Sequence, residues 1–140
     1  YNYNTNNHRH IIEINQELKK FINNENLNFS FNPHILPNFR GMLSTIYCDL
    51  KINISKKNII NEYKEFENNN CFIKFIETNE RLDLFSVQNT NFCKIKIFNH
   101  HSENKIIIVS GIDNLIKGAA GQELQSLNII EGFDEKLSLI

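Results

Sequence analysis

The densest group of ionisable side chains in the chain is the triplet His8-Arg9-His10. A histidine can act as a general acid or base near neutral pH, and a neighbouring arginine can bind an anionic group. On an extended strand, the two histidines would share one face and Arg9 would point to the other. A polar segment can also carry such a triplet by chance, so the spacing alone leaves both interpretations open.

A second candidate for anion binding is Arg40-Gly41, which follows Pro37 in a segment rich in turn residues. An arginine on such a turn can hold a carboxylate or phosphate through two parallel hydrogen bonds, or it can be an ordinary surface residue. His100-His101 lies in a predicted hairpin loop, where we expect solvent exposure. The spacing supplies no third and fourth ligand around it, so we expect no metal site.

The chain has three cysteines, Cys48, Cys71 and Cys93, each beside an apolar or aromatic residue. Their number is odd and no Cys-x-x-Cys pair occurs, so the sequence predicts neither a disulfide framework nor a zinc site. We expect reduced, packed thiols in a cytoplasmic protein.

The segment 113–122 combines an aspartate with four small residues, Gly118-Ala119-Ala120-Gly121. It lacks the Gly-Lys-Ser/Thr ending of a P-loop, and no Gly-x-Gly-x-x-Gly follows a strand. Physical reasoning predicts that Asp113 caps the last helix, and that the small residues allow that helix to approach a neighbouring element closely.

Hydrophobic periodicity predicts an irregular mixture of helices and strands. This mixture favours an α+β fold with a mixed, mostly antiparallel sheet and helices on one face. The expected helices are 11–22, 56–67 with Ser55 as N-cap, and 115–130; the expected strands are 27–31, 42–54, 71–76, 92–98 and 106–112, with a hairpin connection over 99–104.

Composition limits the classes of partner. The 140 residues carry a formal net charge of −1, so no overall positive field favours nucleic acid or an anionic membrane. Lys94 and Lys96 beside Phe92 and Phe98 are too few for a stacking nucleic-acid surface. The longest apolar runs are tetrapeptides, far below the ~20 residues of a membrane span. We therefore expect no nucleic-acid partner and no membrane association.

Four blocks of residues, in order, resemble the C-terminal part of the N-acetyl-gamma-glutamyl-phosphate reductase family. His8-Arg9-His10 with Glu13-Ile14 is similar to the family's His-Arg-His-Thr-Pro-Glu-Ile. The second block, 31–41 (FNPHILPNFRG), is similar to the family's Pro-His-Leu-Xaa-Pro-Xaa-Xaa-Arg-Gly. The third block, 89–93 (NTNFC), is similar to Gly-Thr-Asn-Xaa-Cys. The fourth block, 109–122 (VSGIDNLIKGAAGQ), is nearly the family's closing motif and is followed by Gln125 and Asn128. Ile11-Ile12 departs from the family pattern by replacing Thr-Pro.

The resemblance implies the fold of the C-terminal domain of dehydrogenases of the glyceraldehyde-3-phosphate and aspartate-semialdehyde type. Residues 1–113 would form a substrate-binding and dimerisation domain, and 114–140 a helix and tail that return to a dinucleotide-binding domain. That domain and the family's nucleophilic cysteine, in a Pro-Gly-Cys-Tyr-Pro context, do not occur in this sequence. We therefore expect a fragment of a longer enzyme, inactive alone, with none of its three cysteines as the nucleophile.

The implied reaction reduces N-acetyl-glutamyl 5-phosphate with NADPH, giving the 5-semialdehyde and phosphate in arginine biosynthesis. By resemblance, His8 is the acid/base, with His10 as the alternate, and Arg9 and Arg40 bind the anionic groups of the substrate. Asn114 and Gly118 are the expected cofactor-side positions: Asn114 would reach the nicotinamide carboxamide, whereas Gly118 would permit close packing of the helix rather than bind phosphate. A homo-oligomer, either a dimer or a tetramer formed through the sheet, is also implied.

Two alternatives remain open. The lysine-pathway reductase of the same family, which acts on a carrier-linked aminoadipyl phosphate, shares these motifs. A non-catalytic dimerisation or interaction module would keep the apolar sheet but has no need for the histidine triplet together with Arg40 and Asn114.

Overall fold

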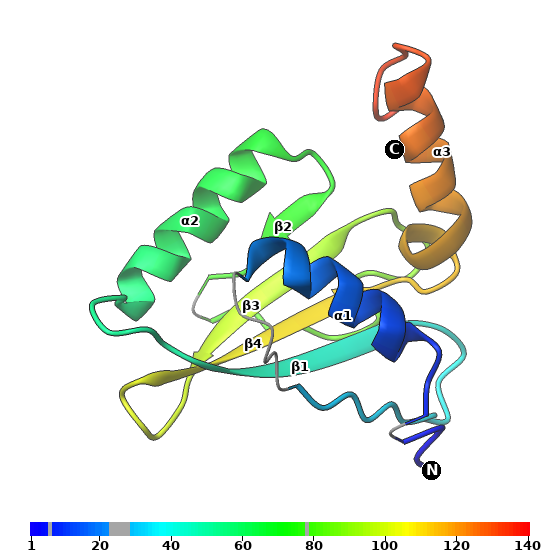
Figure 1. Cartoon of the computed structure of the whole chain (residues 1–140). Helices are drawn as coiled ribbons and strands as arrows, with labels where there is room; N and C mark the ends of the chain where they lie inside the picture. Colours follow the sequence, from blue (N-terminus) through cyan, green and yellow to red (C-terminus); the bar gives the residue numbers. More distant parts are fainter. Residues whose placement is uncertain (6, 23–28, 78) are drawn as a thin grey trace. The chain divides into compact units, whose positions relative to one another are not determined.

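The computed structural model describes residues 1–5, 7–22, 29–77 and 79–140 (Figure 1). The chain forms two compact units, residues 1–38 and 39–140. None of the helices in the described ranges combines the length and the apolar character needed to cross a membrane. The predicted division at residue 113 stays a prediction.

The first unit contains one amphipathic helix, α1 (His10–Phe21), close to the predicted helix 11–22. Glu13 lies in its first turn and Lys19 and Lys20 in its last, as the helix dipole favours. The triplet His8-Arg9-His10 does not lie on an extended strand, the case considered in the sequence analysis, because Arg9 has helical backbone angles and His10 is the first helical residue.

The predicted strand 27–31 is only partly tested, since residues 27 and 28 lie outside the described residues. Residues 29–31 are not in a strand. No neighbouring strand pairs with them; instead Phe31 packs its ring against His8, with 5.3 Å between the ring centres. A short antiparallel bridge between Asn2 and His34 joins the two ends of this unit.

The second unit is built on a sheet of four strands in the order β1-β4-β3-β2. The pairs β1–β4 and β4–β3 are antiparallel and β3–β2 is parallel, so the predicted α+β fold with a mixed, mostly antiparallel sheet is confirmed. The strands are β1 (Met42–Asp49), β2 (Ile73–Phe75), β3 (Cys93–Asn99) and β4 (Lys105–Ile112).

Two connections show how local chemistry sets the ends of strands. The predicted hairpin between β3 and β4 is confirmed, and the Lys105 amide donates to the Ser102 carbonyl to close it. Strand β1 ends at Asp49 rather than at residue 54 as predicted. The chain turns there, because Asn53 adopts a positive φ of 73° and the Ile54 amide donates to the Lys51 carbonyl.

Helix α2 (Lys56–Asn69) begins where the sequence predicts. The Ser55 side chain accepts from the Asn58 amide, and the Asn58 side chain accepts from the Ser55 amide, forming a reciprocal capping box. The helix packs beside β2, and the rings of Tyr63 and Phe75 stack with their centres 5.9 Å apart.

Side chains alternate between the two faces of the sheet. Ile95 and Ile97 point to the face that carries α2, and both are buried. Other buried apolar side chains of this unit are Phe72, Ile76, Val87 and Ile106. The opposite face carries apolar residues that remain partly open to solvent. This open sheet face comprises Leu43, Tyr47, Phe98, Ile107 and Val109, which lie in register across β1, β4 and β3.

The predicted helix 115–130 is divided in two. A short π-helical segment, η1 (Ile116–Ala120), precedes α3 (Gly121–Ile130), and Ala119 between them has non-helical backbone angles. A Cβ atom on Gly121 would lie 2.4 Å from Asn91 Oδ1 and 2.6 Å from Ile116 Cγ2. Only glycine fits there, which confirms the predicted close approach at this position.

Candidate functional site

The first group of candidate residues is the histidine cluster, formed by Tyr3, His8, His10 and Phe31. The His8 ring makes edge contacts with the other three rings, with centres 5.3 Å from Tyr3, 4.6 Å from His10 and 5.3 Å from Phe31. The turn that begins α1 therefore brings the two histidines together, although they do not lie on a strand. Packing on three sides fixes the orientation of the His8 ring.

One hydrogen bond determines which His8 nitrogen is available for chemistry. The His10 amide donates to His8 Nδ1 at 3.2 Å, so Nδ1 is unprotonated and the neutral ring carries its proton on Nε2. Nε2 is therefore the nitrogen left to interact with a substrate: it donates a hydrogen bond from the neutral ring, and it can give up a proton only when the ring is in the imidazolium form. The His10 ring has a different partner, since its Nε2 lies 3.9 Å from Glu13 Oε2.

Arg9, between the two histidines, is exposed. Its guanidinium makes no ion pair or hydrogen bond with any residue in the described part of the chain. All five of its N–H donors are therefore open to an anionic ligand.

The second group of candidate residues is the Asp113 cluster, formed by Arg40, Gly41, Asn89, Asp113 and Asn114. The Arg40 guanidinium forms an ion pair with the Asp113 carboxylate. Its Nη2 donates a hydrogen bond to Oδ1 at 2.9 Å, and its Nε lies 2.8 Å from Oδ2. Its Nη1 donates to Asn89 Oδ1 at 3.1 Å. Arg40 is therefore not a free surface cation, and the Asp113 side chain is completely buried.

Three backbone amides complete the surroundings of the carboxylate. The Asn89 amide donates to Oδ2 at 2.7 Å, and the amides of Leu115 and Ile116 donate to Oδ1 at 2.9 and 3.0 Å. Asp113 thus accepts from the amides that begin η1, whereas α3 has Ala120 as its N-cap with no side-chain hydrogen bond, so the predicted cap of the helix 115–130 holds only for its first segment. Burial by itself would raise the pKa of Asp113, but the amide of Asn89, the amides of the cap and the Arg40 guanidinium outweigh it and lower the pKa.

Asn114 belongs to the same cluster, because its Oδ1 accepts from the Gly41 amide at 2.6 Å. Gly41 has a φ of 118°, in the region that favours glycine. The Arg40 carbonyl accepts from Gln88 Nε2 at 2.8 Å. These contacts connect the Arg40-Gly41 turn, the turn around residue 89 and the start of η1 to one another.

Gly118, the other predicted cofactor-side residue, is exposed, and its amide donates to the Asp113 carbonyl. A Cβ atom there would meet Ile112 Cδ1 at 3.4 Å, an ordinary contact distance. The strict need for glycine therefore lies at Gly121 rather than at Gly118.

Next to Gly121 is a polar network that the sequence alone did not predict. Gln125 Oε1 accepts from Lys117 Nζ at 2.6 Å and from Asn91 Nδ2 at 3.0 Å, while Gln125 Nε2 donates to Glu135. Burial lowers the pKa of Lys117, and nearby Cys93 and Glu135 partly oppose the shift. The network ties the C-terminal tail to α3.

The cysteines are free thiols. Burial raises the pKa of Cys93, with an opposing effect from Lys117, and burial followed by Glu135 raises the pKa of Cys71. A raised thiol pKa disfavours the reactive thiolate. No three His, Cys, Asp or Glu side chains gather into a possible metal site within the described ranges.

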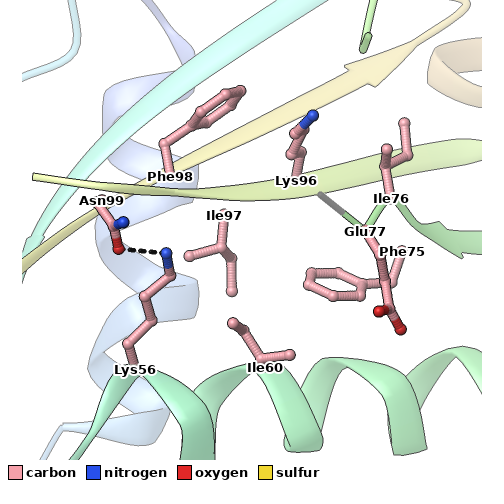
Figure 2. A pocket seen from close by; sticks show the side chains of 9 residues that line it. All are labelled: Lys56, Ile60, Phe75, Ile76, Glu77, Lys96, Ile97, Phe98 and Asn99. Atoms are coloured by element: carbon pink, nitrogen blue, oxygen red, sulfur yellow. Dashed lines mark hydrogen bonds between the residues drawn. The ribbon is translucent and has the colours of Figure 1, made fainter. Parts of the chain in front are cut away.

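A pocket of about 280 Å³ lies between α2 and the β3 edge (Figure 2). Figure 2 shows Ile60 and Ile97 pointing toward each other beside Phe75, while Lys96 and Phe98 point to the opposite side of β3. Lys56 closes one end by donating to Asn99. None of the predicted site residues lines this pocket, so it is separate from both candidate clusters.

Asn89 is the member of the Asp113 cluster that the sequence analysis missed, yet the sequence holds a signal for it. Asn89 stands where the resembling motif has glycine, and its φ is 61°. Asparagine is one of the few other residues that tolerates this conformation. The motif therefore marks a left-handed turn whose amide points at Asp113.

A family model described as "Semialdehyde dehydrogenase, dimerisation domain" matches residues 1–114. Relatives named N-acetyl-gamma-glutamyl-phosphate reductase include those of Methanococcus maripaludis, 44% identical over 94% of this chain and 38% of the relative, and Caldicellulosiruptor bescii, 46% identical over 99% and 40%. A third, from Clostridium novyi, is 40% identical over 98% of this chain and 39% of the relative.

The chain thus spans about two-fifths of the length of the curated relatives that it matches. The family match covers both candidate clusters up to Asn114, and the relatives extend the similarity through η1 and into α3. The chain belongs to the semialdehyde dehydrogenase dimerisation-domain family.

Proposed function

We propose that this chain is the substrate-binding and dimerisation part of an NADPH-dependent reductase that converts N-acetyl-glutamyl 5-phosphate to the 5-semialdehyde. The observation that carries the proposal is the arrangement at the start of α1. A ring-packed histidine with a defined proton position stands beside an arginine with no partner among the described residues. The names of the relatives supply the substrate, and the family resemblance implies the arginine pathway.

In the proposed reaction, a cysteine thiolate from outside these 140 residues attacks the acyl phosphate. A C–S bond forms, the C–O bond to phosphate breaks, and inorganic phosphate leaves. NADPH, when bound, supplies the hydride that reduces the thioester carbonyl. One proton is given to the developing oxygen as the hydride arrives, and the same group takes it back when the C=O bond re-forms and the C–S bond breaks, which releases the aldehyde and regenerates the cysteine thiolate.

His8 is the proposed source of that proton. Its Nδ1 is held by the His10 amide, so Nε2 carries the donated hydrogen. The rings of Tyr3 and Phe31 restrict its rotation, which lowers the entropy cost of positioning the acid. His10 is the alternate donor, and its Nε2 lies 3.9 Å from Glu13 Oε2.

Arg9 is the proposed main ligand for a carboxylate or phosphate group, since its donors are unused by the described residues. Arg40 is proposed as a second anion contact. Three of its five N–H groups are engaged by Asp113 and Asn89, which leaves two for a ligand.

Asn114 is the proposed contact for the nicotinamide carboxamide, with Gly118 close by in the chain. The Asn114 side chain fits this role, because the Gly41 amide fixes its Oδ1 and leaves the two Nδ2 hydrogens as donors for a carbonyl oxygen. In this proposal the dinucleotide-binding domain is also supplied from outside the 140 residues. A protein of this kind works in the cytoplasm, where its three free thiols stay reduced.

The substrate is tested in the reverse direction with the complete product of the gene. We expect NADP⁺ reduction with N-acetyl-glutamate 5-semialdehyde only when phosphate is present. Carrier-linked aminoadipate semialdehyde, assayed in parallel, should react at least 100-fold more slowly. A preference for the carrier-linked substrate would assign the protein to the lysine pathway, and activity with neither would leave the interaction module as the better account.

We further propose that self-association, which the family description implies, uses the open sheet face. Tyr47 and Leu43 are 71% and 47% exposed, and Phe98 beside them is 41% exposed. An antiparallel sheet normally covers one face and leaves the other polar, so an apolar second face indicates a protein partner. A second copy of the domain presents the same face and can cover it.

A further inference from the structure

We infer that Asp113 is a positioning residue that holds Arg40 and Asn114 in one fixed arrangement and so couples the anion side of the site to the cofactor side. The inference rests on the proposed function and adds a residue to it. Asp113 does not contact a reactant in this account, because its side chain is completely buried and its oxygens are occupied.

The Asp113 carboxylate has more partners than a helix cap requires. Asp113 Oδ1 accepts from Arg40 Nη2 and from the amides of Leu115 and Ile116, Oδ2 accepts from the Asn89 amide, and Arg40 Nε lies 2.8 Å from Oδ2 as an ion-pair contact. Capping a helical segment needs only one or two of these contacts. The others connect Asp113 to Arg40, 73 residues earlier in the chain, and to Asn89, 24 residues earlier.

Asp113 sets the orientation of the Arg40 guanidinium. A bidentate contact to a carboxylate fixes the plane of the guanidinium as well as its position. Asn89 Oδ1 holds the third donor at 3.1 Å, and the Arg40 side chain is only 15% exposed. The two remaining donors of Arg40 therefore have directions set by Asp113.

The position of Asn114 also depends on Asp113. Asp113 precedes it directly, and the amides of the two residues after it both donate to Asp113 Oδ1. The Asn114 side chain is in turn held by the amide of Gly41, the neighbour of Arg40. A change in the Arg40–Asp113 pair is therefore transmitted to Asn114 through two short covalent connections.

The test measures steady-state kinetics of the complete protein, varying acyl phosphate and NADPH separately. Asp113→Asn removes the negative charge and places a side-chain NH₂ group opposite N–H groups that now donate to a carboxylate oxygen. These donors lose their acceptor, so we expect KM for both substrates to rise about ten-fold. Asp49→Asn is the matched control, because it removes the partner of Lys105 on β1, outside both clusters; both of its KM values should stay within two-fold of wild type.

Arg40→Lys is the second variant, since it keeps the positive charge and replaces the bidentate contact with a single one. The inference predicts that it raises KM for NADPH by at least three-fold, although Arg40 is assigned to the anion side. A purely structural role would lower kcat through loss of folded enzyme and leave both KM values unchanged.

Each outcome has a separate meaning. If Arg40→Lys changes KM for the acyl phosphate alone, the coupling through Asp113 is wrong, whether or not Asp113→Asn folds. If the wild-type protein lacks reductase activity, the proposed function fails instead, and the two failures are distinguishable.

Discussion

At the scale of single residues, the proposed chemistry depends on a backbone amide. The His10 amide occupies His8 Nδ1, and this contact survives replacement of the His10 side chain. His8→Asn should therefore lower kcat of the complete reductase about 100-fold or more, the usual contribution of a general acid. His10→Asn should lower it less than ten-fold.

The two substitutions are compared by steady-state rates after equal thermal stability has been verified. Equal losses for the two variants would mean that the rings share the proton transfer, and a larger loss for His10→Asn would make the alternate residue the acid.

Asp113 provides a pH prediction with a definite sign. Its pKa is lower in the folded chain than the ordinary value of about 4, so the unfolded chain binds the proton more tightly. The stabilisation from the ionised group is complete above pH ~4 and is lost as the pH falls through the lower folded pKa. Urea unfolding of the wild type should show this loss below pH ~4.

Asp113→Asn should unfold at lower urea concentration near neutral pH and should lack this part of the acid dependence. Asp49→Asn, whose side chain is exposed, is the control. A constant stability difference between wild type and Asp113→Asn from pH 7 to pH 2 would show that the Asp113 charge does not contribute.

At the scale of elements, the junction between η1 and α3 makes the sharpest prediction. Gly121→Ala places a Cβ 2.4 Å from Asn91 Oδ1 and 2.9 Å from the Ile116 carbonyl oxygen, so we expect a loss of about 1–3 kcal/mol in the free energy of unfolding. Gly118→Ala is the matched control, because its new Cβ meets only ordinary contacts, and its free energy of unfolding should change by less than about 1 kcal/mol. Chemical denaturation measures both, and equal effects would contradict the packing at Gly121.

Elements with a local cause were predictable from the sequence. The Ser55 cap and the apolar face of α2 are both local features, and the β3–β4 hairpin follows from two adjacent strand patterns. The break at Ala119 was not predictable from local periodicity, and beside it Gly121 lies so close to Asn91, 30 residues earlier, that an added Cβ would meet Asn91 Oδ1 at 2.4 Å. The end of β1 at Asp49 depends on the turn at Asn53, whose signal was weak in a chain this rich in asparagine.

The candidate site divides in the same way. The sequence motifs identified His8, Arg9, Arg40 and Asn114 as candidate site residues. They did not predict which residues these side chains contact. The pairing of Arg40 with Asp113 joins residues 73 positions apart, and only the sheet register between β1 and β4 brings them together. Long-range pairing of this kind has no signature in local periodicity.

At the scale of the whole molecule, the open sheet face predicts self-association. Tyr47→Glu places a charge on the β1 side of this face, at its most exposed apolar residue, and we expect the dissociation constant of the oligomer to rise at least ten-fold. Phe85→Glu is the control, since Phe85 is 84% exposed outside the sheet. Sedimentation velocity over a range of concentrations measures both variants, and unchanged association of Tyr47→Glu would exclude this face.

A further expectation concerns the 140 residues by themselves. In the proposed reaction the thiol nucleophile and the dinucleotide site come from elsewhere, so the purified 140-residue chain should show no NADPH oxidation with the acyl phosphate. Measurable turnover that survives repurification would contradict the proposal that the nucleophile and the dinucleotide site lie outside these residues. It would require a nucleophile among Cys48, Cys71 and Cys93.

The central claim is that this domain serves the reduction of an acyl phosphate, and the stoichiometry of a single assay tests it most directly. The complete protein is given N-acetyl-glutamyl 5-phosphate and NADPH, and three quantities are followed together. We predict that NADPH oxidised, phosphate released and semialdehyde formed are equal throughout the reaction. Phosphate release without matching NADPH oxidation, or no consumption of either substrate, would contradict the account.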